Sequence, residues 1–236
     1  MCTVTWLPLS NSGFILTSNR DEAVNRQASN PAFELIGDVK VLFPKDPKAG
    51  GTWIATNPQR TVCLLNGAFE KHAHQPPYRR SRGLMLLDSF EFASIYTFST
   101  VYDFEEIEPF TCIVAEGKQL FEMRWNGTEL FFKELDFYKT NIWASATLYT
   151  PGVILKRKSW FEKWLDNNPT LTVDAILAFH EFTGDGNTEN DLVMSRGTVL
   201  KTVSITSVKL VDEILTMYHK DLLAANTNTI HTTIFN

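Results

Sequence analysis

Hydrophobic and polar positions alternate through the first part of the chain in the pattern of a β-hairpin. The alternation covers residues 2–8 and 14–21, and the segment Ser10-Asn11-Ser12-Gly13 between them has the composition of a turn. Strands joined by such a short connection pair in antiparallel orientation. The pattern therefore predicts that the chain opens with a hairpin.

The register of this hairpin decides which side chains lie together. A tight turn at its centre makes the numbers of paired residues sum to 23, which places Cys2 opposite Asp21 and Val4 opposite Asn19. Asp21 belongs to the cluster Asn19-Arg20-Asp21-Glu22. We therefore expect a thiol and a charged cluster at the same end of one sheet.

Strand-like and non-periodic segments follow the hairpin. Residues 22–45 show no clear period, and we expect a long loop there. Strands are predicted over 52–56 and 61–65, with a turn at 57–60 between them, because β-branched and aromatic residues are concentrated in both. Three strand-like runs between Phe110 and Leu135 predict an antiparallel meander.

Helical periods appear in three places. Ser81 is expected to cap a helix that begins at Arg82, with a second apolar stretch continuing to about Tyr96. Apolar residues at three- and four-residue spacing predict two further helices, over 151–166 and 172–182. The last segments, 198–210 and 214–223, read as a strand followed by a strand or short helix.

Together these elements predict an α+β fold with a largely antiparallel sheet. A chain of 236 residues with 44% apolar and 21% charged residues can form one large core, so we expect a single domain over residues 1–236.

Charge and cysteine content restrict the function. A formal net charge of −5 disfavours a nucleic-acid-binding surface and leaves small neutral or locally recognised anionic partners. Three cysteines without framework spacing indicate a reducing compartment. No signal-peptide pattern and no apolar run long enough to span a bilayer is present, so a cytoplasmic location is expected.

Cys2 becomes the first residue if Met1 is removed, and its chemistry then changes. Its free α-amine can act as the base for its own thiol, directly or through one water. Arg20 could favour the thiolate, and Asp21 could accept hydrogen bonds from the α-ammonium group. The alternative is that Cys2 is a small buried hydrophobe and that the cluster is a polar strand end.

Two further segments carry candidate chemistry. Paired glycines, Gly50 and Gly51, precede Trp53 and would allow close backbone approach by a ligand or another strand, or form a tight turn before a core tryptophan. Asn66 ends an apolar strand before Gly67, where its amide could donate to an oxyanion. Asn-Gly is also ordinary turn chemistry.

Basic and histidine-rich segments give weaker signals. The side chains of Arg79, Arg80 and Arg82 could hold a carboxylate or phosphate, or could form a solvated basic face. The pair His72 and His74, with the distant His180, has no further ligand at fixed spacing. We therefore predict no metal and no cofactor, and we expect the oxygen-rich segment 185–191 to be a surface loop.

Several of these segments together resemble the NRDE-motif family, also called the transport-and-Golgi-organisation protein 2 family. The resemblance is strongest over residues 1–90. It is carried by Met1-Cys2-Thr3, Ser18-Asn19-Arg20-Asp21-Glu22, the stretch from Pro44 to Trp53, Asn66 and Ser81-Arg82-Gly83.

This resemblance implies an N-terminal-nucleophile (Ntn) hydrolase-like fold, a four-layer αββα sandwich of two antiparallel sheets. In related penicillin V acylases and bile salt hydrolases, an N-terminal cysteine attacks an amide, and Cys2 occupies the corresponding position. Arg20, Asp21 and Asn66 resemble further catalytic residues. Where those relatives use a second asparagine this chain offers Ser145, and Arg196 is the candidate for a late arginine.

Two functions are therefore expected. The first is an amidohydrolase or acyltransferase acting on a C–N bond of a small substrate, with Cys2, Arg20, Asp21 and Asn66 as catalytic residues. The second is a non-catalytic protein that binds or carries a hydrophobic anionic ligand, haem or an acyl lipid, in the same fold. In both, substrate or ligand would contact Asn19, Trp53, Arg79, Arg80 and Arg82.

Overall fold

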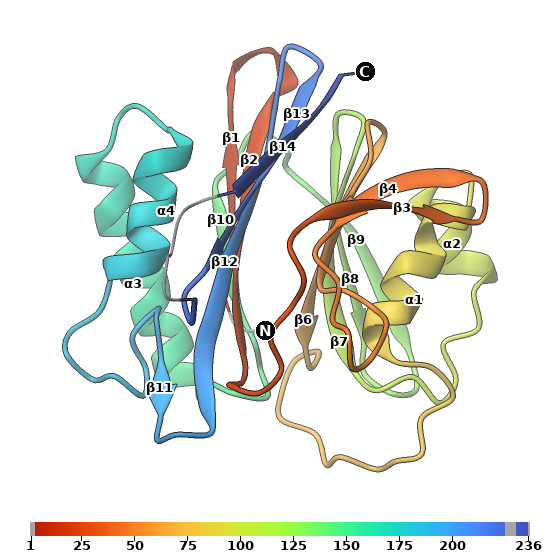
Figure 1. The fold of residues 1–236 in the computed structure, drawn as a ribbon, viewed down its shortest axis with the longest axis horizontal. Helices are drawn as coiled ribbons and strands as arrows, with labels where there is room; N and C mark the ends of the chain where they lie inside the picture. Colours follow the sequence, from red (N-terminus) through yellow and green to blue (C-terminus); the bar gives the residue numbers. More distant parts are fainter. Residues whose placement is uncertain (1–2, 225–229, 236) are drawn as a thin grey trace. The chain divides into compact units, whose positions relative to one another are not determined.

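The computed structural model describes residues 3–224 and the backbone of residues 230–235, so Cys2 lies outside the described residues. The chain divides into two compact units (Figure 1). Unit 1 is formed by Met1–Gln27 and Tyr138–Asn236, and unit 2 by Ala28–Phe137. Each contains an antiparallel sheet with its own helices, which confirms the predicted α+β class. The prediction of a single domain stays a prediction.

Unit 1 is built on a seven-stranded sheet within the described part of the chain. Its order is β10-β1-β2-β12-β13-β14, and β11 pairs with β12. The strands are β1 (Thr3–Pro8), β2 (Phe14–Ala23), β10 (Asn141–Ala144), β11 (Ser195–Arg196), β12 (Leu200–Val211), β13 (Ile214–Asp221) and β14 (Ile230–Phe235). Both chain ends therefore contribute to one sheet, and the segment predicted as strand or short helix is the strand β13.

The predicted pairing of the opening strands is confirmed over the described residues, but the predicted register is wrong by one residue. Thr3 pairs with Asn19 and Val4 with Ser18, so paired numbers sum to 22. The connection is a five-residue loop, closed by a 2.8 Å hydrogen bond from Leu9 N to Gly13 O, and contains the short 3-10 helix η1 (Ser10–Ser12). An odd number of loop residues shifts the pairing by one relative to a two-residue turn.

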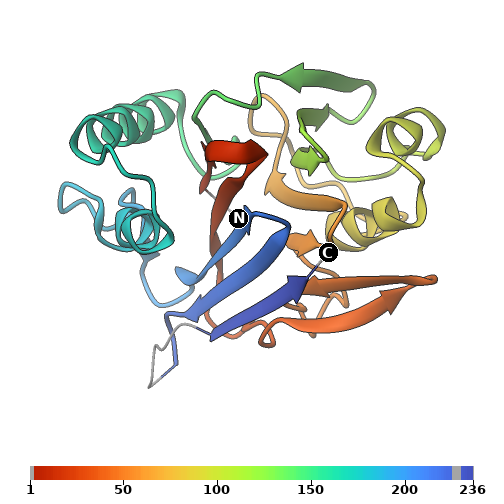
Figure 2. The same ribbon diagram turned by 90° about the horizontal axis from the view of Figure 1, so that it is seen from above.

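Two helices cover one face of this sheet. They are α3 (Pro151–Asn167) and α4 (Val173–Phe182), and Figure 2 shows them together on one side of the unit 1 strands. Thr172 caps α4 by accepting a hydrogen bond from Ala175 N, as Ser and Thr do at helix starts. The core between sheet and helices contains Leu7, Ile15, Phe161, Val173, Ile176, Phe179 and Leu192.

Unit 2 contains a second seven-stranded sheet, in which neighbours in sequence are also neighbours in space. Its order runs from β3 to β9: β3 (Ala32–Ile36), β4 (Val39–Phe43), β5 (Ile54–Thr56), β6 (Arg60–Asn66), β7 (Phe110–Glu116), β8 (Gln119–Trp125) and β9 (Leu130–Leu135). The predicted meander of 110–135 is confirmed as β7 to β9.

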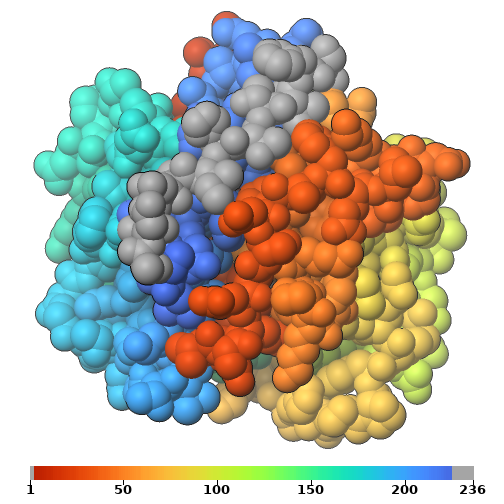
Figure 3. Space-filling model, viewed as in Figure 1, coloured from red at the N-terminus to blue at the C-terminus, as the bar shows by residue number. Residues whose placement is uncertain are grey.

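The prediction of a structureless loop over 22–45 is wrong. Residues 32–43 form the hairpin β3–β4, whose atoms lie on the visible face of unit 2 in Figure 3, coloured orange-red. Gly37 in its turn has a φ of 55°, which glycine adopts at no steric cost. Residues of β3 are mostly exposed or half-buried, so the strand lacks the strong apolar alternation by which a half-buried strand is recognised.

The helices of unit 2 are shorter than expected. α1 (Arg82–Asp88) is capped by Ser81, which accepts a hydrogen bond from Leu84 N, as predicted. It leads into the 3-10 helix η2 (Ser89–Glu91), and the chain then extends before α2 (Ile95–Val101), capped by Ser94. The apolar stretch predicted to continue to Tyr96 therefore belongs to two helices.

Glycine allows α1 to approach its neighbour closely. A Cβ added to Gly51 would lie 2.5 Å from the backbone carbon of Gly83, and one added to Gly83 would lie 2.7 Å from Thr52 O. The close backbone approach predicted at the Gly50-Gly51 pair is therefore present at Gly51, where α1 makes it, whereas a Cβ on Gly50 would meet only a side-chain atom of Leu84, at 4.0 Å. The backbone that lies against Gly51 thus belongs to a helix and not to another strand.

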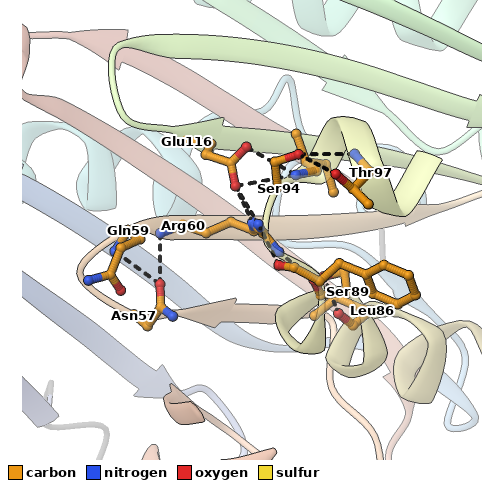
Figure 4. Close-up of polar contacts among 10 residues, drawn as sticks. Asn57, Gln59, Arg60, Leu86, Ser89, Ser94, Thr97 and Glu116 are labelled. Atoms are coloured by element: carbon orange, nitrogen blue, oxygen red, sulfur yellow. Dashed lines mark hydrogen bonds and ion pairs between the residues drawn. The ribbon is translucent and has the colours of Figure 1, made fainter. Parts of the chain in front are cut away.

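A buried arginine holds these helices to the sheet (Figure 4). The Nη1 and Nη2 atoms of Arg60, at the start of β6, donate to the carbonyl oxygens of Ser89 and Phe92, and its Nε donates to Glu116 at 2.6 Å. Glu116 also accepts from Ile95 N at 3.0 Å, which satisfies a backbone donor at the start of α2. This Arg60 clamp fixes the segment between α1 and α2.

Candidate functional site

The residues predicted from the sequence fall into both units. Cys2 lies outside the described residues, while Asn19, Arg20 and Asp21 occupy the end of β2 in unit 1. The other candidates belong to unit 2: Trp53, Asn66, Arg79, Arg80 and Arg82. We describe the two groups separately, beginning with β2.

Asn19 is fully buried and fastens α4 to the sheet. Its Nδ2 donates to the backbone oxygens of His180 and Leu192, at 3.2 and 2.6 Å. Its Oδ1 is 2.6 Å from His180 Nδ1, and an amide oxygen can only accept. His180 Nδ1 therefore carries the proton, and its Nε2 accepts from Thr5 Oγ1 at 2.8 Å. Burial, together with the charge of Arg157, lowers the pKa of His180 to about 3, which keeps the ring neutral.

Asp21 is buried, and a donor orients each of its carboxylate oxygens. Tyr149 Oη donates to Oδ2 at 2.7 Å, and Thr202 Oγ1 donates to Oδ1 at 2.6 Å. Thr202 lies directly opposite Asp21 on β12, next to an irregularity in the pairing of β12 with β2. Two hydroxyl donors, one on β12 and one on the segment between β10 and α3, thus fix the plane of the Asp21 carboxylate.

Arg20 is also buried, but its side chain points to the opposite face of the sheet from Asp21, since adjacent strand residues alternate. Its Nη1 donates to Arg26 O at 2.6 Å, and its Nη2 lies 4.0 Å from Glu22 Oε2. On this face the pKa of His219 is lowered to about 4, chiefly by burial, with the charge of Arg20 contributing. A buried cation and a buried anion therefore flank the end of β2.

Sequence reasoning missed a buried cation close to the residues of β2, Arg157 on α3. It is fully buried, and its Cζ lies 3.6 Å from the centroid of the Tyr149 ring. Its Nη2 donates to Asn190 O and Asp191 O, and its Nη1 donates to Thr3 Oγ1. The signal was present in the sequence: Arg157 lies four residues before Phe161, on the face of α3 that meets the core.

Unit 2 holds the predicted oxyanion donor, Asn66, at the end of β6 and the predicted substrate-contacting Trp53 just before the neighbouring strand β5. Asn66 ends β6, paired with Phe110, and Gly67 follows it with a φ of 80°. Trp53 is buried immediately before β5, and its carbonyl accepts from Leu64 N at 2.8 Å. The turn chemistry expected at Asn66-Gly67 is therefore present. A catalytic role for Asn66 stays a prediction.

Each of the three predicted anion-binding arginines has an acidic partner within unit 2. Arg79 Nη2 lies 3.6 Å from Asp103 Oδ2. The guanidinium of Arg80 donates to both carboxylate oxygens of Asp88. Arg82 Nη2 lies 2.9 Å from Glu108 Oε2. Tyr102 also donates to Asp88, at 2.8 Å, and burial raises the pKa of that phenol. Binding of a ligand carboxylate by these arginines stays a prediction, and it would compete with these internal contacts.

The two histidines of the 67–81 segment meet Glu108. His72 Nε2 and His74 Nδ1 both lie 3.2 Å from Glu108 Oε1. Coulombic attraction by Arg82 and these hydrogen bonds outweigh burial and lower the pKa of the Glu108 carboxyl. Among the described residues, no group of three or more His, Cys, Asp or Glu side chains is placed to hold a metal ion.

Cys63 and Cys112 are buried in unit 2, and neither is part of a disulfide. They lie on the neighbouring strands β6 and β7, where Cys63 pairs with Ile113 and Cys112 with Leu64. Burial raises the pKa of Cys112 well above its ordinary value, which disfavours the reactive thiolate.

Comparison with known families decides the relationship of this chain. The family model described as Transport and Golgi organisation 2 matches residues 1–198. The chain belongs to this family. The resemblance inferred from the NRDE segment is thereby confirmed, and the matched region includes both groups of candidate residues.

Membership of the Transport and Golgi organisation 2 family does not by itself assign a reaction. Among curated proteins, none matches the sequence. No helix in the described part of the chain is long and apolar enough to cross a membrane.

Proposed function

We propose that this chain is an N-terminal-cysteine amidohydrolase or acyltransferase that acts on the C–N bond of a small amide. The observation that carries the proposal is the pairing of Thr3 with Asn19. Thr3 directly follows Cys2, and Asn19 directly precedes Arg20 and Asp21. The first strand therefore begins beside the end of β2 that carries a buried guanidinium and a buried carboxylate.

The proposed reaction begins after removal of Met1. The Cys2 thiolate attacks the carbonyl carbon, a C–S bond forms, and the C–N bond breaks as the leaving nitrogen takes a proton from the α-ammonium of Cys2. Water, activated by the same α-amine, then cleaves the thioester to give a carboxylic acid and the free thiol. In acyl transfer, a second amine or alcohol replaces this water.

Arg20 and Asp21 suit different parts of this reaction because they lie on opposite faces of β2. A guanidinium favours the thiolate form of a nearby cysteine, and a carboxylate favours the charged form of a nearby amine. Asn66 would supply a donor to the oxyanion. Ser145 replaces the second asparagine of the acylases that the family resembles. Its hydroxyl lies 3.0 Å from Thr147 Oγ1.

The decisive test compares three forms of the chain. They are the mature protein, Cys2→Ser, and a form in which a lysine inserted between Met1 and Cys2 keeps the nitrogen of Cys2 in an amide. Intact-mass analysis first establishes which form begins at Cys2. We expect the mature protein alone to hydrolyse acyl amides, because both altered forms lose the nucleophile or its base.

Full activity in the extended form would refute the use of the α-amine. If the mature protein releases no product from a panel of acyl amides but binds haem or acyl lipid, the binding function should replace the enzymatic one.

Thiol reactivity provides a second prediction that needs no substrate. In the mature protein, iodoacetamide should label Cys2 faster than Cys63 or Cys112, which are buried. Arg20→Ala should slow the labelling of Cys2, since loss of the cation raises the thiol pKa. Peptide mass spectrometry over time measures all three rates, and equal rates in wild type and Arg20→Ala would contradict the role of Arg20.

A further inference from the structure

The carboxylate of Asp21 depends for its orientation on a side chain far away in sequence. Tyr149 is buried, and its hydroxyl donates to Asp21 Oδ2 at 2.7 Å. Thr202 occupies the other oxygen at 2.6 Å. With one donor on each oxygen, the carboxyl group cannot rotate without losing a charge-assisted hydrogen bond, which is the stronger kind.

The ring of Tyr149 is held in turn by Arg157. The guanidinium lies against the ring face at 3.6 Å, well within the range of a cation–π contact. Arg196 approaches the same ring at 5.4 Å. The arrangement fixes the ring position from which the hydroxyl reaches Asp21.

Arg157 is an unusual buried cation. In the described part of the chain its donors meet two backbone oxygens, of Asn190 and Asp191, and the hydroxyl of Thr3, and it forms no ion pair with a carboxylate. Burying a charge without a counter-ion is costly. The carboxylate connected to it is Asp21, through the Tyr149 ring and hydroxyl.

One guanidinium thus contacts both the residue that follows Cys2 and the ring that orients Asp21. We propose that Tyr149 and Arg157 are positioning residues that aim the Asp21 carboxylate at the α-amine of Cys2. This inference rests on the proposed function. It adds Tyr149, on the segment after β10, and Arg157, on α3, to the proposed residues of the first hairpin.

A purely structural role makes a different prediction. The same contacts also tie α3 and the 190–191 segment to β1, so their loss could weaken packing without any effect on the amine. The two roles are separated by the pKa of the α-amine, because only a positioned carboxylate favours the ammonium form.

The experiment measures that pKa in a Cys2→Ser background, where the α-amine is retained and the competing thiol is absent. Trace acetic anhydride labels the amine over a range of pH values, and mass spectrometry of the N-terminal peptide gives the labelled fraction. Asp21→Asn should lower the amine pKa. Tyr149→Phe, which keeps the ring against Arg157, should lower it in the same direction by about half as much or more.

Ser207→Ala is the matched control. Its hydroxyl is buried and forms a 2.8 Å hydrogen bond with Thr17 on the same face of the sheet, without contact to Asp21. It should leave the amine pKa unchanged at a comparable cost in thermal stability. Arg157→Lys, which keeps the charge but loses the planar stacking surface, should shift the pKa as Tyr149→Phe does.

The outcomes distinguish the two proposals. If Asp21→Asn leaves the amine pKa unchanged, Asp21 does not accept hydrogen bonds from the amine, and the role that the proposed function gives to Asp21 is refuted. If Asp21→Asn lowers it but Tyr149→Phe leaves it unchanged or raises it, the positioning role is overturned while the proposed function stands. Tyr149→Phe decides the question even if Arg157→Lys does not fold.

Discussion

At the scale of single residues, unit 1 buries an unusual amount of charge and polarity under α3 and α4. Asn19, Asp21, Arg157 and His180 are all buried, and each forms hydrogen bonds with hydroxyls, backbone oxygens or, for Asn19 and His180, with the other's side chain. Buried polar networks are stabilising only when their members are satisfied. His180 must stay neutral for this to hold. A second proton would occupy the Nε2 atom that accepts from Thr5 and would place a positive charge near that of Arg157.

The pH dependence of stability should reveal the buried histidines. In the unfolded chain a histidine gains a proton near pH 6.5. In the folded protein the pKa is about 3 for His180 and about 4 for His219, because both rings are buried. Between pH 6.5 and 4 the unfolded chain therefore binds more protons than the folded protein. The free energy of unfolding is unaffected by these histidines above pH 6.5 and decreases as the pH falls toward 4, by up to about 1.4 kcal/mol per pH unit for each histidine.

Urea unfolding at intervals between pH 5 and 7 measures this slope, in a range where most carboxylates remain ionised. His219→Gln should reduce the slope, whereas His74→Gln, at an exposed position, should leave it as in wild type. A free energy of unfolding that stays constant over this range would contradict the burial of both rings.

At the scale of elements, strong local patterns were predictable and weak ones were not. The meander of 110–135, the cap Ser81 and the opening hairpin follow from alternation and capping residues. The hairpin β3–β4 was missed because every residue of its first strand is exposed or half-buried, so the strand shows no strong apolar alternation. The partners of Asp21 could not be inferred either, since Tyr149 and Thr202 reach it across more than a hundred residues of chain.

Glycine at the second position of two helices gives an opposed pair of predictions. Alanine normally favours a helix over glycine by up to about 1 kcal/mol. Gly152→Ala in α3 should follow this rule, because its nearest neighbour would be 4.0 Å away. Gly83→Ala in α1 should instead destabilise by about 1 to 3 kcal/mol, because the new methyl would meet the backbone of Thr52. Stabilisation by both substitutions in urea unfolding would contradict the close approach of α1.

The Arg60 clamp makes a second prediction at this scale. Arg60→Met should destabilise the protein by about 3 kcal/mol, since it leaves Glu116 and two carbonyl groups without their buried partner. Lys45→Met is the comparison, because the Lys45–Glu34 pair is more than one third exposed and should contribute less than about 1 kcal/mol. Similar losses for both variants would show that the clamp is not specific.

At the scale of the whole molecule, we predict that residues 1–236 unfold as a single domain although they form two compact units. The test uses Gly83→Ala in unit 2 and Ser207→Ala in unit 1. Each should shift one common transition, seen identically by tryptophan fluorescence and far-UV circular dichroism. Two separable transitions, each sensitive to one variant alone, would contradict the prediction.

The pairing of β2 with β12 has a consequence for synthesis on the ribosome. Ala23 pairs with Leu200, so the open edge of β2 leaves the ribosome long before its partner exists. At ordinary translation speeds, that interval lasts on the order of ten seconds or more. The whole of unit 2 is synthesised within it, and the neighbours of its sheet are also neighbours in sequence. The nascent chain should therefore complete unit 2 first, while the edge of β2 beside the candidate site remains unpaired and accessible to chaperones.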